Sequence, residues 1–104
     1  MDEELERCIA DARVCADMCE AYLGTLPQGS AELRRAVDLL AAPAAVARTL
    51  DDLADQPLPL TLAAARLLHD LAGAAAERVD GRPELAQALR AVAESSVRLV
   101  RAAE

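Results

Sequence analysis

Three cysteines, Cys8, Cys15 and Cys19, stand close together near the beginning of the sequence. In an α-helix each residue turns the chain by about 100°, so spacings of seven and four residues bring a side chain back to nearly the same direction. The three thiols are therefore predicted to share one narrow stripe of a helix. The same periodicity adds Ala12 and Tyr22 to this inward stripe.

Two of these thiols are spaced to hold one metal ion between them. Cys15 and Cys19 are one helical turn apart, which places their sulfur atoms about 5 to 6 Å apart before the side chains adjust. Paired thiolates in an apolar channel suit Cu(I), which accepts two sulfur ligands, better than Zn(II), which needs four donors. Cys8 lies about 10 Å further along the axis, so it would serve a second ion or a transfer step. Cys8, Cys15 and Cys19 thus predict a copper site of one or two ions per chain.

A different interpretation of the same stripe needs no metal. A free cysteine is among the most often buried residue types and behaves as a small hydrophobic side chain, so the three cysteines would then only fill a core. A disulfide between Cys15 and Cys19 is disfavoured, because residues one helical turn apart reach disulfide geometry only with strain. The discriminating feature is whether the cysteines face one shared interior or separate apolar pockets.

The composition predicts an all-α protein with one domain over residues 1–104. Of its 104 residues 54% are hydrophobic, and Gly and Pro are few, which excludes a disordered chain. There are 25 Ala and 17 Leu, both strong helix formers, whereas β-branched residues are scarce and Tyr22 is the single aromatic residue. A β or α/β architecture is therefore improbable.

Turn signals divide the chain into four helical segments of similar length. The breaks are Leu26 to Ser30, Gln56 to Pro59 and Asp80 to Pro83. Short connections between four helices predict an antiparallel up-down-up-down bundle. The expected helices run from Glu3 to Leu23, from the N-cap Ser30 to about Asp55, from about Leu60 to Val79, and from Pro83 to near Ala103.

The second expected helix contains Pro43, which removes a backbone hydrogen bond and clashes with the preceding turn. A kink or a split into two shorter helices is predicted there. Periodicity gives the inward positions of this helix as Leu33, Val37, Leu40, Ala44 and Ala47. The corresponding stripe is Leu68, Ala72, Ala75 and Val79 in the third helix, and Leu85, Leu89, Val92, Ser96 and Leu99 in the fourth.

The charge balance excludes several classes of partner. The chain has 18 acidic and 11 basic residues, all of the latter Arg, and a formal charge of −7, which would repel nucleic acid. No apolar run reaches the length of about 18 residues that spans a membrane. The acidic first residues do not resemble a secretory signal, so a cytoplasmic location with reduced thiols is predicted.

The run from Cys8 to Glu20, Cys-Ile-Ala-Asp-Ala-Arg-Val-Cys-Ala-Asp-Met-Cys-Glu, resembles the first helix of the copper storage family of cysteine-rich four-helix bundles. That resemblance implies a bundle whose interior thiolates hold many Cu(I) ions. It continues more weakly through Arg35-Ala-Val-Asp-Leu-Leu, Arg66-Leu-Leu-His-Asp-Leu-Ala and Arg90-Ala-Val-Ala-Glu-Ser-Ser. Those three helices carry aliphatic residues or Ser96 instead of cysteines, which puts bulk storage in doubt.

Four further features of the sequence predict mainly structural details. His69 lies about 100° from the stripe of its helix, which indicates a hydrogen-bonded, partly exposed histidine, the alternative being a metal ligand at the mouth of the bundle. Tyr22 is expected to cap one end of the bundle. Met18 is a weaker metal-ligand candidate because it lies off the cysteine stripe. The charges Asp11, Arg13, Asp17 and Glu20 are expected to form local ion pairs on a solvated face.

Three hypotheses about function remain open. The first is a Cu(I)-binding protein of low capacity that uses Cys8, Cys15 and Cys19. The second is a structural or interaction protein that has kept the bundle and lost the metal, assembling with itself as a homo-oligomer or with a thiol-rich relative. The third, a copper–thiolate enzyme, has little direct support, because no acid–base constellation or nucleophile motif accompanies the cysteines.

Overall fold

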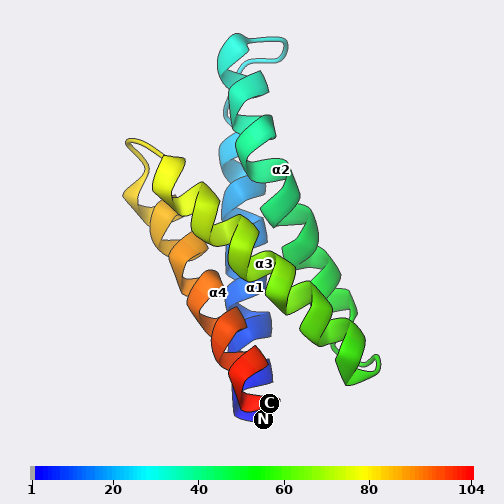
Figure 1. Ribbon diagram of the computed structural model, residues 1–104. Coiled ribbons are helices and arrows are strands. Elements are labelled where there is room, and N and C mark those ends of the chain that lie inside the picture. The colour runs from blue at the N-terminus through cyan, green and yellow to red at the C-terminus, as the bar shows by residue number, and fades with distance from the viewer. Residues whose placement is uncertain (1) are drawn as a thin grey trace.

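The computed structural model describes residues 2–104, which form four α-helices joined by three short connections (Figure 1). Within this range no residue is in a β-strand. The helices alternate in direction, and the two ends of the chain lie side by side at one end of the molecule. The predicted all-α antiparallel bundle is therefore confirmed. The helices are α1 (Asp2–Gly24), α2 (Ala31–Asp52), α3 (Leu58–Arg78) and α4 (Pro83–Ala102).

The helix ends follow from local chemistry. Ser30 caps α2 as expected, because its Oγ accepts a hydrogen bond from the Leu33 amide at 3.0 Å. A proline stands at the first or second position of both α3 and α4, where its missing amide costs no helical hydrogen bond. Gly29 and Gly81 adopt positive φ angles of 75° and 70° in the connections before α2 and α4.

The connection between α2 and α3 lies slightly earlier in the sequence than expected. α2 ends at Asp52 rather than at about Asp55, and α3 already begins at Leu58. The Leu53 carbonyl that follows α2 accepts a hydrogen bond of 3.0 Å from the hydroxyl of Thr61, which is 2% exposed. This buried bond joins the end of α2 to the first turns of α3.

Pro43 does not split α2, so that part of the prediction is wrong. The helix runs without interruption from Ala31 to Asp52 with Pro43 inside it. The Pro43 ring is fully buried, and Leu40, Ala44 and Ala47 on the same helix are buried with it. Burial of apolar surface on this face offsets the lost hydrogen bond.

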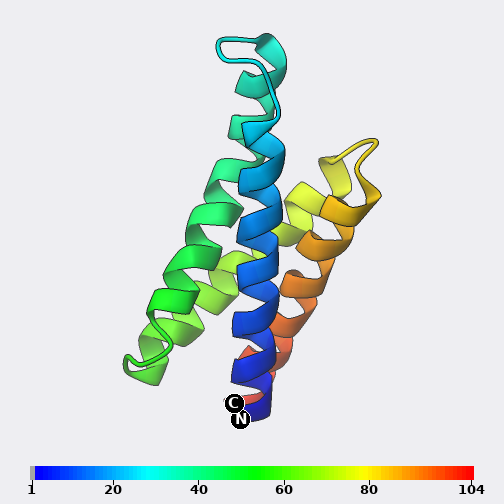
Figure 2. The ribbon, with the colours of Figure 1, turned by 180° about the vertical axis from the view of Figure 1, so that it is seen from behind.

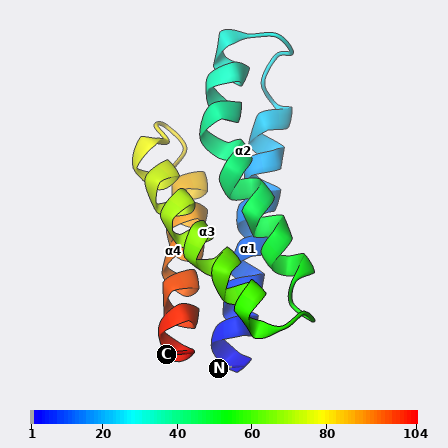
Figure 3. The same ribbon diagram turned by 45° about the vertical axis from the view of Figure 1, so that its right-hand side comes forward.

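Each helix packs against two neighbours in a ring. α1 contacts α2 and α4, and α3 completes the ring by contacting the same two helices. Figure 2 shows α1 between α2 and α4. The α1–α2 hairpin projects beyond the α3–α4 connection, and the two hairpins diverge at that end (Figures 1 and 3).

The interior is built from small side chains on α1, and from both leucines and small side chains on the other three helices. The expected α4 stripe is confirmed, since all its members are buried. On α3 the first three stripe positions are buried and Val79 is half-buried. On α2 the expected inward Val37 is 40% exposed, whereas the neighbouring Ala36 is 8% exposed. The buried stripe of α2 runs through Ala36, Leu40, Pro43, Ala47 and Leu50, so Val37 lies beside it.

In the described structure Arg13, Asp17 and Glu20 of α1 form ion pairs with residues of α2, which corrects the expectation of local ion pairs among them. Arg13 and Asp51 are joined at 2.9 Å, and Arg48 bonds both Asp17 and Glu20. These pairs are largely exposed to water, so each contributes little to the stability of the fold. Because they join two antiparallel helices, they favour one register of α1 against α2.

Two glycine substitutions test the helix assignments in opposite directions. Gly73 lies inside α3 with open space where a Cβ would be, so Gly73→Ala should stabilise the protein by about 0.5 to 1 kcal/mol. Gly29 also has open space, but its φ of 75° disfavours any side chain, so Gly29→Ala should destabilise by about 1 kcal/mol. Urea midpoints measure both effects. If both substitutions moved the urea midpoint equally and in the same direction, the placement of Gly73 inside a helix and of Gly29 in a left-handed turn would be contradicted.

Candidate functional site

The three cysteines of α1 are completely buried in one shared core. Cys8, Cys15 and Cys19 are each 0% exposed, together with Ala12 of the same stripe. They belong to a single cluster of buried residues that draws on all four helices. The predicted inward stripe is thus confirmed, and the thiols share one interior.

Cys15 and Cys19 form an interacting pair of thiols. The interaction between the two thiols lowers the pKa of Cys19, against the opposing effect of burial. The same interaction is the first cause of the strongly raised pKa of Cys15, followed by burial and by the charge that Cys19 would carry. The pair can therefore lose one proton far more easily than two. A cation between the sulfurs removes this obstacle, because it neutralises the charge that opposes the second ionisation.

Cys8 has a different partner. Its Sγ atom lies 3.5 Å from the Oγ atom of Ser96 on α4, and both residues are fully buried. Burial is the main cause that raises the pKa of Cys8, and hydrogen bonds from Ser96 and Ser95 oppose it in part. Periodicity had placed Cys8 and Ser96 on the inward stripes of their helices, but the contact between them depends on how α1 and α4 align along their length.

The donor set around the thiols is small. Among residues 2–104 no group of three or more His, Cys, Asp or Glu side chains is placed to hold a metal ion. The paired Cys15 and Cys19 therefore offer two sulfur donors, and Cys8 offers one sulfur beside a hydroxyl. Two donors meet the requirement of Cu(I) and fall short of the four that structural Zn(II) takes.

His69 is a hydrogen-bonded histidine at the contact between α3 and α4. Its ring is half-buried, and its Nδ1 atom lies 2.8 Å from the carbonyl oxygen of Ala93 on α4. Because a carbonyl oxygen only accepts, the Nδ1–H group is the donor in this bond. The bond fastens α3 to α4, and the interpretation as a hydrogen-bonded histidine is confirmed.

Tyr22 marks the diverging end of the bundle. Its ring is half-buried at the end of the cysteine stripe, and the Arg82 guanidinium lies 4.7 Å from the ring centroid. Two open cavities of about 450 and 380 Å³ flank this tyrosine. Met18 lines the smaller cavity and does not join the thiol pair in the buried stripe.

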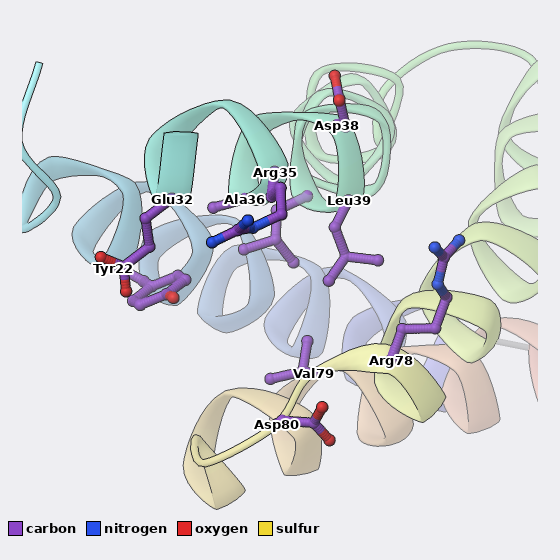
Figure 4. A pocket seen from close by; sticks show the side chains of 10 residues that line it. Tyr22, Glu32, Arg35, Ala36, Asp38, Leu39, Arg78, Val79 and Asp80 are labelled. Atoms are coloured by element: carbon purple, nitrogen blue, oxygen red, sulfur yellow. The ribbon is translucent and has the colours of Figure 1, made fainter. Parts of the chain in front are cut away.

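Figure 4 shows the larger cavity, which lies between α2 and the end of α3. Its wall combines apolar side chains with charges of both signs and contains no cysteine. The thiols are therefore separate from this cavity. The lining residues are Tyr22, Glu32, Arg35, Ala36, Asp38, Leu39, Leu40, Arg78, Val79 and Asp80.

Comparison with known proteins identifies no relative of this chain. No protein-family model, no curated protein and no solved structure matches the chain. In the part of the chain that the structure describes, no helix combines the length and apolar character needed to cross a membrane.

The burial of Cys15 leads to a stability prediction. Cys15→Ser places a more polar group at a position with no exposure, which should lower the free energy of unfolding of the metal-free protein by about 1 to 3 kcal/mol. Ala10→Ser is the matched control, since Ala10 is an exposed residue of the same helix. Denaturant midpoints measure both. Coinciding midpoints for wild type and Cys15→Ser would show that burial at this position contributes nothing.

The raised pKa of Cys8 predicts a loss of stability in alkaline solution. The unfolded chain exposes this thiol, whose ordinary pKa is about 8.5, whereas the folded protein keeps it protonated to higher pH. Its contribution is therefore fully present below about pH 8.5 and is lost as the pH rises toward the folded pKa. Cys19, with a lowered pKa, contributes in the opposite sense.

The comparison of wild type with Cys8→Ala isolates this effect. Between about pH 7 and about pH 10, the free energy of unfolding should fall more steeply for wild type than for the variant. Urea unfolding of reduced, metal-free protein at several pH values provides the measurement. Parallel profiles would mean that Cys8 titrates alike in the folded and unfolded chains.

Proposed function

We propose that the protein binds Cu(I) at low capacity, with one tight site formed by Cys15 and Cys19. The observation that carries the proposal is the interacting pair of fully buried thiols on one turn of α1. Two sulfur donors in an apolar interior suit a soft ion that accepts two ligands. The resemblance of the run from Cys8 to Glu20 to copper storage proteins supports the same ion.

Proton release is the expected chemical signature of this site. Binding one Cu(I) replaces two S–H bonds by two Cu–S bonds, releases two protons and leaves a bis-thiolate centre of charge −1. Because protons compete with the metal for the sulfurs, the apparent affinity should increase with pH. The reducing cytoplasm that the sequence predicts would keep the thiols free for this reaction.

Cys8 is assigned to a second and weaker equivalent. It lies about two turns from Cys15 along α1, too far to share the same ion. Its nearest polar partner is the Ser96 hydroxyl, a poorer ligand for Cu(I) than a second thiolate. Three thiolates therefore limit the capacity to about two ions per chain.

Competition with a chromophoric Cu(I) chelator under anaerobic conditions tests the assignment. Wild type should retain no more than about two equivalents, and the Cys15→Ala, Cys19→Ala double variant should lose the tight one. Cys8→Ala is the matched control, because it removes a thiol from the same stripe and should keep the tight equivalent. Cu(I) should also raise the thermal midpoint of wild type and of Cys8→Ala.

The proposal is wrong if wild type and the double variant yield copper to the chelator identically. A circular dichroism spectrum of the double variant distinguishes loss of ligands from loss of fold. Should the folded variant bind copper as wild type does, the three cysteines are packing groups.

A second candidate function is that of a structural or interaction protein that assembles with itself. The hydrogen bond between Cys8 and Ser96 favours it, because it shows one of the three thiols serving as a core group between α1 and α4. In this case the bundle presents surfaces, and the cysteines only fill its interior. The measurement that tests it is the oligomeric state of metal-free, reduced protein.

A further inference from the structure

The outward side of α3 carries an apolar face that no other helix covers. Leu60 and Leu67 are 52% and 50% exposed, although both are large hydrophobic residues. α3 also has fewer charged residues than α1, α2 or α4. In Figure 1 this helix lies in front of α1, with its outer side open. A helix that is apolar on both its inner and outer sides normally has partners on both.

The exposed leucines belong to a continuous face along the helix. At about 100° per residue, its members point within about 40° of the direction of Leu67, and the face ends before Arg78, which points the same way in the last turn of α3. All members of this face are Leu or Ala residues. Leu71 is half-buried, and the others are exposed. This outer α3 face consists of Leu60, Ala63, Leu67, Leu71 and Ala74.

We propose that the outer α3 face binds a second copy of this chain, with the two α3 helices antiparallel about a two-fold axis at Leu67. This arrangement gives the self-assembly of the second candidate function a particular surface, and it does not depend on metal binding. A two-fold axis requires a surface that is complementary to itself. The outer α3 face meets this requirement in both its apolar and its charged residues.

The apolar residues match in size about the axis. Leu67 meets Leu67 of the second copy at the centre of the contact. Leu60 then lies opposite Ala74, and Leu71 opposite Ala63, so that each large side chain beyond the centre faces a small one. Such alternation lets two helices approach closely without leaving voids.

The charges on one edge of the face are also self-complementary. Arg66 and Asp70 lie on the same edge, and the described structure gives neither of them an ion pair within the chain. In an antiparallel helix pair the same edges of the two helices meet. A two-fold axis near Leu67 therefore brings Arg66 of each copy beside Asp70 of the other. The remaining charges of α3, Glu77 and Arg78, lie opposite positions 57 and 56, just before α3 of the second copy begins.

The size of the contact indicates a weak, concentration-dependent dimer. One helix of 21 residues is about 31 Å long, and a single pair of such helices buries less area than a typical permanent interface. Each copy also carries a net charge of −7, which opposes association at low salt. Dimers should therefore form across the micromolar to millimolar range at physiological salt.

Sedimentation equilibrium of the full chain, reduced and free of metal, tests the apolar centre. Wild type should show a monomer–dimer equilibrium, and Leu67→Glu should weaken it by at least about tenfold, because two carboxylates would meet on the axis. Val14→Glu is the matched control. Val14 is 51% exposed, lies on α1 diagonally across the bundle from α3, and should leave the equilibrium unchanged.

A charge exchange tests the antiparallel register. Arg66→Asp and Asp70→Arg each place like charges opposite one another, so each variant alone should dimerise more weakly than wild type. An equimolar mixture of the two should form heterodimers at least as well as wild type forms homodimers, because each edge then meets the opposite sign. Circular dichroism spectra of all variants serve as the control that each remains helical.

Strictly monomeric wild type throughout the concentration range overturns the proposal. So does an assembly that Leu67→Glu leaves intact, or a mixture of the charge variants that associates no better than either alone. These results are independent of the copper titration, since Cys15 and Cys19 are unchanged in every variant. Failure here would therefore leave the copper proposal standing, and failure of the copper titration would leave this one standing.

Discussion

The rest of the structure depends on the burial of one narrow face of α1. This face contains only alanine and cysteine along most of its length, and its members have no exposure. Small side chains let α2 and α4 approach α1 closely, while leucines on α2, α3 and α4 fill the interior between the helices. Ion pairs from Arg13 and Arg48 lie at the edge of this contact and favour its register.

The chemistry of the thiols is a consequence of that burial. In water, Cys15 and Cys19 would titrate as ordinary thiols, whereas in the core the ionisation of one suppresses that of the other. Burial in the core therefore makes Cys15 and Cys19 good packing groups, and it also makes their ionisation depend on a nearby cation. Cys8 shows the other outcome, since a buried thiol beside the Ser96 hydroxyl needs no ion to satisfy it.

The bundle is less uniform outside than its regular sequence suggests. At one end the two hairpins diverge, and open cavities lie on both sides of Tyr22. On the outside of α3 an apolar face remains exposed at Leu60 and Leu67. The exposed face of α3 remains because four helices in a ring can each bury only one side, while the sequence of α3 is apolar on two.

The sequence by itself determined the four helices, their antiparallel order and the inward direction of Cys8, Cys15 and Cys19, because helical periodicity and turn residues act over a few neighbouring positions. It could not decide that α2 continues through Pro43, since this depends on the core that buries the ring. Nor could it assign the partners of Arg48 or Cys8, which are set by how neighbouring helices align. Contacts between distant residues were decided by the tertiary structure alone, because side-chain packing across the whole bundle selects one alignment of the helices.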